Sequence, residues 1–412
     1  MLNKNFFKTL GPGILFASTA IGVSHLVQST RAGAEYGFAL VGFVFLANIF
    51  KYPFFEFGSR YANVTGKTLL EGYQKKGNWI LWIYFIITLL SMFIVVAAVS
   101  FVCSGLISEL VDNQFNINKI LFFLFFLCVV ILINGKFNIL DSLVKVIAVV
   151  LLISTFLAFI FTLINGPELR IHGFIKPEIF NDKGILFVIA LMGWMPTAVD
   201  MSVWNSIWTI KRMEQTNYKP KLRETLLDFN IGYIITIILS IFFITLGAYL
   251  MFGTGEKLPD SSSLFANKLI SLYTSSLGIW SYWIIAVSAF SVMFSTTLSV
   301  IDGYSSTIQK TIKLLFKLNS TFFIYKISLL VIVFGSYIIT WKFIDNFKQL
   351  IDLATTISFL IAPFCAIANH IVVHSDDIPI NKRPPFWLKI LSFMGIIFLI
   401  LFSLIYLFYL IK

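Results

Sequence analysis

An apolar segment of membrane length near the start of the chain is interrupted at its middle. It covers residues 11–38, and Gly22, Ser24 and His25 form the interruption. Inside a bilayer, unwound backbone leaves carbonyl and amide groups that only protein or a cavity can satisfy. The segment is therefore predicted to be a helix broken next to a binding site, and not a plain anchor.

A second apolar segment, at residues 190–202, is broken in the same way. Pro196 and Asp200 lie inside it. Two interrupted spans at matching places in two halves of a chain are typical of the central site of a transporter. The sequence therefore predicts a transporter with broken helices 1 and 6.

The composition places the chain in a membrane. Hydrophobic residues make up 58% of the 412 residues, charged residues 12%, and the mean hydropathy is +0.88. A soluble fold with a polar surface is excluded by these values. The fold class is predicted to be an all-α membrane protein with the lipid bilayer as its solvent.

Apolar runs of about 20 residues mark the candidate spans. There are about eleven, near residues 12–34, 38–57, 79–108, 117–135, 139–165, 184–209, 229–252, 277–299, 321–341, 350–373 and 386–411. Most of the 31 lysines and arginines fall on one side if the N-terminus is inside. This bias predicts a cell-membrane protein with a cytoplasmic N-terminus and an outside C-terminus.

The spacing of the two breaks predicts the internal organisation. Five spans separate them, so two five-span repeats of opposite topology are expected within a single domain covering residues 1–412. The first repeat is expected at about 10–166 and the second at about 184–375, followed by an extra helix at about 386–411. No loop is long enough for a separate soluble domain.

The net charge and the cysteines carry no separate function. The charge of +11 comes from short loops between spans, which suits anionic lipid head groups and excludes a nucleic-acid partner. Cys103, Cys128 and Cys365 lie in apolar runs at spacings unlike a metal or disulfide framework, so they are expected to pack as small apolar side chains. No cofactor is expected, and the oligomeric state is left open.

Several motifs resemble the NRAMP divalent metal transporters. GPG at 11–13 and AGAEYGF at 32–38 match the family's first span without a gap. Residues 60–71 are similar to its second loop, Met195 and Pro196 to its Met-Pro-His step, and IAPF at 361–364 to its tenth span. The resemblance implies the LeuT-like architecture and transport of a divalent metal ion as substrate.

The same resemblance places most of the family's metal-binding side chains on other residue types. Gly22 stands for its Asp, His25 for its Asn, Thr197 for its His, Ser202 for its later His and Thr355 for its Gln. Met195 is kept, and Met192 falls where the family supplies a backbone carbonyl. The family's acidic residues of the third span have no counterpart within residues 79–108.

These positions define the candidate substrate site. Its members are Gly22, Ser24, His25, Met192, Met195, Thr197 and Thr355, with His25 and Met195 as the metal ligands if a metal binds. A site of this kind is soft and uncharged, which suits a late transition metal. Half-helix N-termini at Ser24 and Thr197 would equally suit a carboxylate-bearing or neutral organic solute, so both alternatives stay open.

A receptor or a multi-pass enzyme is the third class. It would need a soluble effector domain or a paired catalytic constellation, and four scattered histidines supply neither. The chain is therefore expected not to be an enzyme.

Ionisable residues inside spans are candidates for coupling or gating. Asp200 follows Pro196 by one turn, and Arg31 is its hypothesised partner. Lys51 and Glu56 are about 140° apart around a helix, so each is expected to pair elsewhere or to line a cavity. Glu56 is also kept as a candidate for proton or solute contact.

A hydroxyl-rich cluster in the eighth span has two possible roles. Ser295, Thr296, Thr297 and Asp302 either line the pathway or pack helices.

Overall fold

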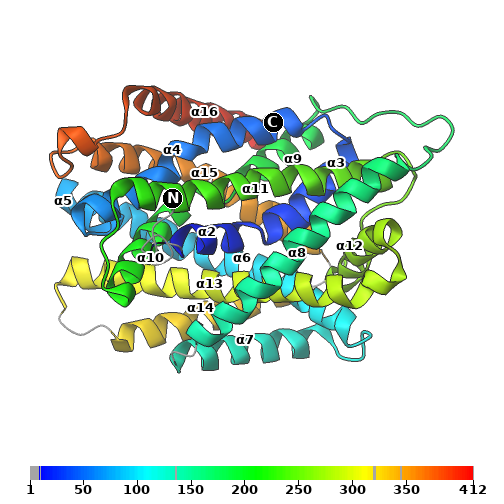
Figure 1. The fold of residues 1–412 in the computed structure, drawn as a ribbon, viewed down its shortest axis with the longest axis horizontal. Helices are drawn as coiled ribbons and strands as arrows, with labels where there is room; N and C mark the ends of the chain where they lie inside the picture. The colour runs from blue at the N-terminus through cyan, green and yellow to red at the C-terminus, as the bar shows by residue number, and fades with distance from the viewer. Residues whose placement is uncertain (1–8, 10, 135–136, 319–321, 344–345, 412) are drawn as a thin grey trace.

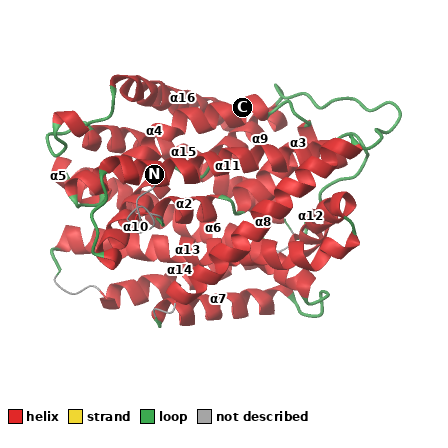
Figure 2. Cartoon of the chain, viewed as in Figure 1, coloured by secondary structure: helices red, strands yellow, loops and turns green. Residues whose placement is uncertain are grey.

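The described part of the chain is built from helices. The structure is a computed structural model that describes residues 9, 11–134, 137–318, 322–343 and 346–411. Figure 2 shows helices joined by loops, and no strand occurs among the described residues. The long helices lie roughly along the longest axis of the molecule, side by side, as expected for a bundle of membrane spans (Figure 1).

All eleven predicted spans coincide with helices or with pairs of half-helices. The continuous spans are α4 (Val41–Thr65), α6 (Asn78–Leu110), α7 (Ile117–Ile133), α8 (Phe137–Asn165), α11 (Leu222–Leu250), α13 (Tyr282–Phe316), α14 (Phe322–Lys342), α15 (Phe347–Val373) and α16 (Phe386–Ile411). The first span consists of α2 (Pro12–Ala20), the π-helical η1 (Ser24–Ser29) and α3 (Thr30–Tyr36), and the sixth of α9 (Asp182–Gly193) and α10 (Met201–Thr216). Short helices complete the chain at α5 (Leu69–Lys76), α12 (Ser262–Leu277), η2 (Ile279–Ser281) and η3 (Ile380–Lys382).

Six helices within the described residues are long and apolar enough to cross a membrane by themselves. They are α6, α11, α13 together with η2, α14, α15 and α16. The first and sixth spans are split in two, and α7 is shorter. The eighth span was predicted at 277–299, but its helix covers Tyr282–Phe316, because hydropathy marks only the apolar part of a helix that continues with polar residues.

The GPG motif begins the first span against α11. Pro12 occupies the first helical turn, where its missing N–H costs nothing. The amides of Gly11 and Gly13 donate to the Asp228 carboxylate at 3.2 and 2.7 Å. A Cβ on Gly13 would lie 2.0 Å from the Asp228 carbonyl oxygen. Glycine is therefore required for this close approach, and Asp228 caps the N-terminus of α2 from another span.

The break in the first span is a widened turn. The amides of His25 and Leu26 both donate to the Gly22 carbonyl, at 3.2 and 3.1 Å. The Ala20 carbonyl accepts from the side chain of Ser24 instead, and His25 Nδ1 lies 3.0 Å from it. The Ser24 hydroxyl thus bonds to a carbonyl of the preceding turn, and a half-helix N-terminus at Ser24 that binds a solute stays a prediction.

The break in the sixth span is a true unwinding. Helix α9 ends at Gly193 and α10 begins at Met201, so residues 194–200 lie outside both helices. A Cβ on Gly193 would lie 2.0 Å from the Thr355 carbonyl oxygen. The end of α9 therefore packs directly on the backbone of α15.

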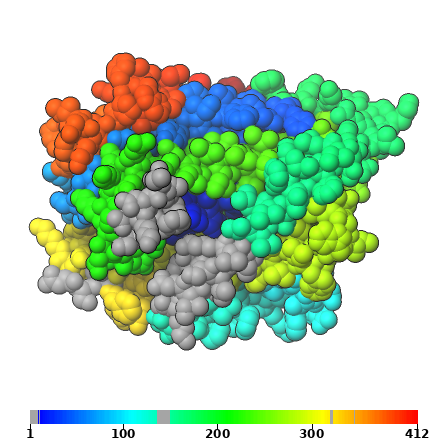
Figure 3. All heavy atoms as spheres, in the orientation of Figure 1, coloured from blue at the N-terminus to red at the C-terminus, as the bar shows by residue number. Residues whose placement is uncertain are grey.

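Neighbouring spans bury the first span. In Figure 3 only a small area of dark blue, the beginning of this span, is visible at the centre of the face shown. Its second half packs on α11 through Gly33 and Gly247, whose added Cβ atoms would lie 2.0 Å from the Ile244 carbonyl oxygen and 2.2 Å from the Thr30 carbonyl oxygen. Small residues allow helix backbones to approach this closely.

We expect Gly33→Ala to destabilise the fold. The added methyl group forces α3 and α11 apart, an overpacking effect that costs about 1–3 kcal/mol. Thermal unfolding in detergent measures the change with a thiol-reactive dye, because Cys103, Cys128 and Cys365 are buried and free. Gly42→Ala is the control, since nothing lies within 4 Å of its added Cβ. Equal melting temperatures for the two variants would contradict the packing argument.

Candidate functional site

A small cavity lies between the two broken spans. It measures about 30 Å³ and is lined by residues of α2, η1, α6, the sixth-span break, α10 and α13. Ser24, Thr197 and Asp200 of the predicted site line it. The remaining predicted substrate-site residues, Gly22, His25, Met192, Met195 and Thr355, are not among its lining residues.

Asp200 is the single charged residue that lines this cavity. It follows the unwound segment and is buried. It is the N-cap residue of α10, although its side chain makes no capping hydrogen bond to that helix. The positive end of the helix dipole at the start of α10 favours its negative charge.

Aromatic and hydroxyl side chains form the rest of the lining. Trp194 and Trp204 come from the sixth span and Tyr304 from α13, with the Trp204 and Tyr304 ring centroids 4.8 Å apart. Thr19 and Thr296 add hydroxyl groups. Thr296 of the hydroxyl-rich cluster thus lines the cavity, and its role in a pathway stays a prediction. Asp302 of the same cluster lies elsewhere, bonded to Tyr325 at 2.8 Å.

Gly22 has no room for the acidic side chain that the resemblance would place there. An added Cβ would lie 2.7 Å from Thr296 Cγ2 and 2.9 Å from its Oγ1. Thr296 is held in place by hydrogen bonds to the Ser18 and Val292 carbonyls, at 3.1 and 3.0 Å. The space next to the first break is therefore filled from α13.

His25 faces α11. Its Nε2 lies 2.8 Å from the Thr236 carbonyl oxygen, and its Nδ1 lies 2.7 Å from Ser24 Oγ. The side chain is fully buried. Because both ring nitrogens have partners, His25 in this conformation joins the first span to α11 and offers no nitrogen to a metal.

The two methionine positions do not converge on His25 either. Met195 Sδ accepts from Ser29 Oγ at 3.9 Å, and the Met192 carbonyl accepts from the Lys51 ammonium at 2.6 Å. In the described part of the chain, no group of three or more His, Cys, Asp or Glu side chains is arranged to hold a metal ion. The residues that a metal would need are thus present only as separate, already bonded groups.

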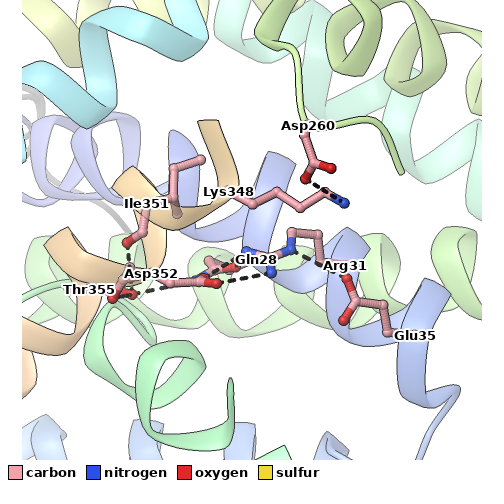
Figure 4. Close-up of polar contacts among 8 residues, drawn as sticks. All are labelled: Gln28, Arg31, Glu35, Asp260, Lys348, Ile351, Asp352 and Thr355. Carbon is pink, nitrogen blue, oxygen red and sulfur yellow. Dashed lines mark hydrogen bonds and ion pairs between the residues drawn. The ribbon is translucent and has the colours of Figure 1, made fainter. Parts of the chain in front are cut away.

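Arg31 binds Asp352 of α15 and not Asp200, so the hypothesised Arg31–Asp200 pair is wrong. Its Nη1 and Nη2 lie 2.7 and 3.1 Å from the two Asp352 carboxylate oxygens (Figure 4). Gln28 donates to the same carboxylate at 3.1 Å and to Thr355 Oγ1 at 3.4 Å. The Arg31 guanidinium also lies 4.9 Å from the centroid of the Phe187 ring.

These contacts close the predicted outer end of the bundle between α3 and α15. Sequence reasoning missed Asp352, although an acidic residue inside a predicted span is itself a signal of function. Thr355, one turn deeper on α15, lies beneath this closure and is buried.

Glu56 pairs with Arg60 one turn along α4. Arg60 Nε is 3.0 Å from both carboxylate oxygens, and both side chains are buried. Arg60 also donates to the Lys382 carbonyl oxygen at 2.7 Å. Glu56 and Lys51 thus have separate partners, as predicted, and a proton or solute role for Glu56 stays a prediction.

A second closure lies at the predicted cytoplasmic end. Tyr61 donates to Asp377 at 3.3 Å, and Lys75 forms an ion pair with the same carboxylate. Partial burial raises the pKa of Asp377, but the Lys75 hydrogen bond and charge outweigh it, so the pKa lies below its ordinary value. Together with Arg60 and Lys382, these contacts join α4 and α5 to the segment between α15 and α16.

Known proteins are similar to this chain in sequence and in fold. A family model described as natural resistance-associated macrophage protein-like (Nramp) matches residues 13–409. The protein PM0681 of Pasteurella multocida is 34% identical over 97% of this chain and 92% of its own length. A divalent metal cation transporter, MntH of Levilactobacillus brevis, is 23% identical over 75% of this chain and 67% of its own.

Solved structures of other transporters have a fold similar to that of this chain. The manganese transporter of Eremococcus coleocola has a TM-score of 0.69 at 15% identity, covering 98% of this chain and 86% of its own. Mhp1, a nucleobase-cation-symport-1 family transporter, has a TM-score of 0.61 at 14% identity, covering 96% of this chain and 91% of its own. The chain is therefore a multi-pass membrane protein with the LeuT-like fold, and it belongs to the Nramp family of transporters.

Proposed function

We propose that this chain is a secondary transporter that moves its solute by alternating access through the cavity between the first and sixth spans. The observation that carries the proposal is the position of that cavity. It adjoins both helix breaks and lies between two closures, one at Arg31 and Asp352 and one at Tyr61, Lys75 and Asp377. Opening either closure while the other holds would expose the site to one side at a time.

The solute that the geometry supports best is a small organic cation. Asp200 supplies a single negative charge, and Trp194, Trp204 and Tyr304 supply aromatic faces that attract cations. The hydroxyl groups of Ser24 and Thr197 add polar contacts that would orient the solute. A cavity of about 30 Å³ holds about one water molecule, so the break segments must move outward to admit such a solute.

A divalent metal ion is the second candidate. It is favoured by the names of the relatives and by the retained Met195. Binding through His25 and Met195 would require His25 to leave the Thr236 carbonyl and the first span to rotate. Such a site would form only in another conformation.

We expect Asp200→Asn to reduce cation binding and uptake by at least about tenfold, since a hydrogen bond to a charged group contributes about 1.5–3 kcal/mol. Thermal shift with choline, putrescine, Mn²⁺, Co²⁺, Zn²⁺ and Cd²⁺ identifies the class of solute. Uptake of the stabilising compound into proteoliposomes then measures transport. Glu178→Gln is the control, because this exposed loop residue also loses one negative charge.

The results separate the candidates. Stabilisation by an amine in the wild type but not in Asp200→Asn supports the organic cation. Stabilisation by metals alone, unchanged in Asp200→Asn and abolished by His25→Ala with Met195→Ala, favours the metal and overturns the organic cation. Full uptake by Asp200→Asn would contradict its place in the site.

We expect Asp352→Ala to open the predicted outer end. The substitution leaves the nearly buried guanidinium with only Glu35 and Gln28 of its own span, so the contact between α3 and α15 loses its main polar link. A cysteine introduced as Thr355→Cys reports the opening through its labelling rate with a membrane-impermeant thiol reagent. The rate should rise at least severalfold over that of Thr355→Cys alone.

Asp260→Ala is the matched control for this experiment. It breaks the Lys348–Asp260 ion pair on the same side of the molecule, whose Asp260 side chain is 67% exposed, and leaves Arg31 intact (Figure 4). Equal labelling rates in Asp352→Ala and Asp260→Ala would show that the Arg31–Asp352 pair does not close the site.

A further inference from the structure

The Lys51 ammonium lies inside the break of the sixth span. Lys51 projects from α4 and is fully buried. Its Nζ lies 2.6 Å from the Met192 carbonyl oxygen, 2.8 Å from that of Gly193 and 3.3 Å from that of Thr197. The three N–H donors of the ammonium thus have three carbonyl acceptors. We call these three carbonyls the carbonyl cage.

The cage is where an unwound span would hold a free cation. Met192 and Gly193 end α9, so their carbonyls lie at the negative end of the helix dipole, and the Met192 carbonyl accepts only a long backbone hydrogen bond, from the Met195 amide at 3.4 Å. Thr197 adds a carbonyl from the unwound segment itself. Unwound carbonyls and half-helix C-termini of this kind coordinate the coupling ion in inverted-repeat transporters.

Hydrogen bonding to the carbonyls does not by itself explain why a lysine occupies position 51. Burying a charge in a bilayer protein is costly, and a neutral amide side chain could donate two hydrogen bonds without that cost. The Phe359 ring, whose centroid is 6.0 Å away, and the charge of Asp200 also act on the ammonium. Among the ion pairs of the described residues, none includes Lys51. The surroundings are those of a cation site made of carbonyl dipoles.

We propose that Lys51 is a tethered cation that fills the carbonyl cage in place of a free metal ion. The ammonium holds the broken sixth span in shape without a coupling cation, and its charge repels any cation that approaches the same carbonyls. Lys51 is therefore a specificity-determining residue of the transporter. The inference does not depend on which solute the central cavity carries.

The cage itself suits a monovalent ion. It presents three neutral oxygens and no carboxylate, whereas Ca²⁺ and Mg²⁺ sites use carboxylates or retained water molecules. Removal of the lysine side chain should thus create a site for Na⁺ or K⁺.

Binding of radioactive Na⁺ to the purified full chain tests the proposal, with thermal unfolding as the second measurement. Chloride salts of Na⁺, K⁺ and N-methylglucamine are compared at constant ionic strength. The wild type should melt at the same temperature in all three and bind no Na⁺. Lys51→Ala should melt lower in N-methylglucamine and recover saturably by several degrees in Na⁺ or K⁺.

Two further variants keep the result interpretable. Lys51→Met retains the apolar stem but not the charge, so it serves if Lys51→Ala does not fold, and it should bind Na⁺ more weakly than Lys51→Ala. Lys326→Ala removes a lysine whose ammonium lies over the Phe322 ring at 4.6 Å, and it should behave as the wild type. Stoichiometric Na⁺ binding by the wild type would overturn the proposal. A melting temperature of Lys51→Ala and Lys51→Met that is lowered equally in all three salts would also overturn it.

Discussion

The broken spans depend on side chains that satisfy their exposed backbone carbonyls. Within a bilayer, an unpaired carbonyl has no water to bind, so each break needs a donor from the protein. Ser24 donates to the Ala20 carbonyl in the first span, and Lys51 donates to three carbonyls in the sixth. These donors stabilise the breaks. In the first span the donor comes from the span itself, and in the sixth it comes from α4.

The same donors determine what the centre of the molecule can bind. Thr296 occupies the space beside Gly22, His25 is bonded to Thr236 of α11, and Lys51 fills the carbonyls at the end of α9. Each group takes up a position from which a metal ion could have been held. Only Asp200 presents a charge to the cavity, so the scaffold of the family is kept while its central chemistry is rearranged.

The sequence predicted the spans well, because membrane length and hydropathy are local properties of the chain. It located both breaks, since Gly22 and Pro196 are local signals as well. It could not predict partners across spans. Arg31 was expected to bind Asp200, and the structure brings Asp352 to it, because the pairing depends on how α3 and α15 pack.

The direction in which a side chain points could not be predicted from the sequence either. His25 was expected to face a bound solute, yet the widened turn of η1 directs it toward α11. A single additional residue in a helical turn changes which face a side chain occupies, and no sequence pattern reports that change. Lys51 was recognised as an ionisable residue inside a span, but its acceptors are backbone carbonyls, which carry no sequence signal.

Both closures keep one partner in contact with water. At the predicted outer end, the Arg31 side chain is 6% exposed and that of Asp352 is 36% exposed. At the predicted cytoplasmic end, the Lys75 side chain is 64% exposed and that of Asp377 is 14% exposed. Solvent and salt weaken an ion pair in proportion to its exposure, so neither of these two ion pairs is strongly shielded. The shielded pair is Glu56–Arg60 beside the inner closure, whose side chains are 3% and 7% exposed, and it therefore holds α4 together more firmly than either closure holds its helices.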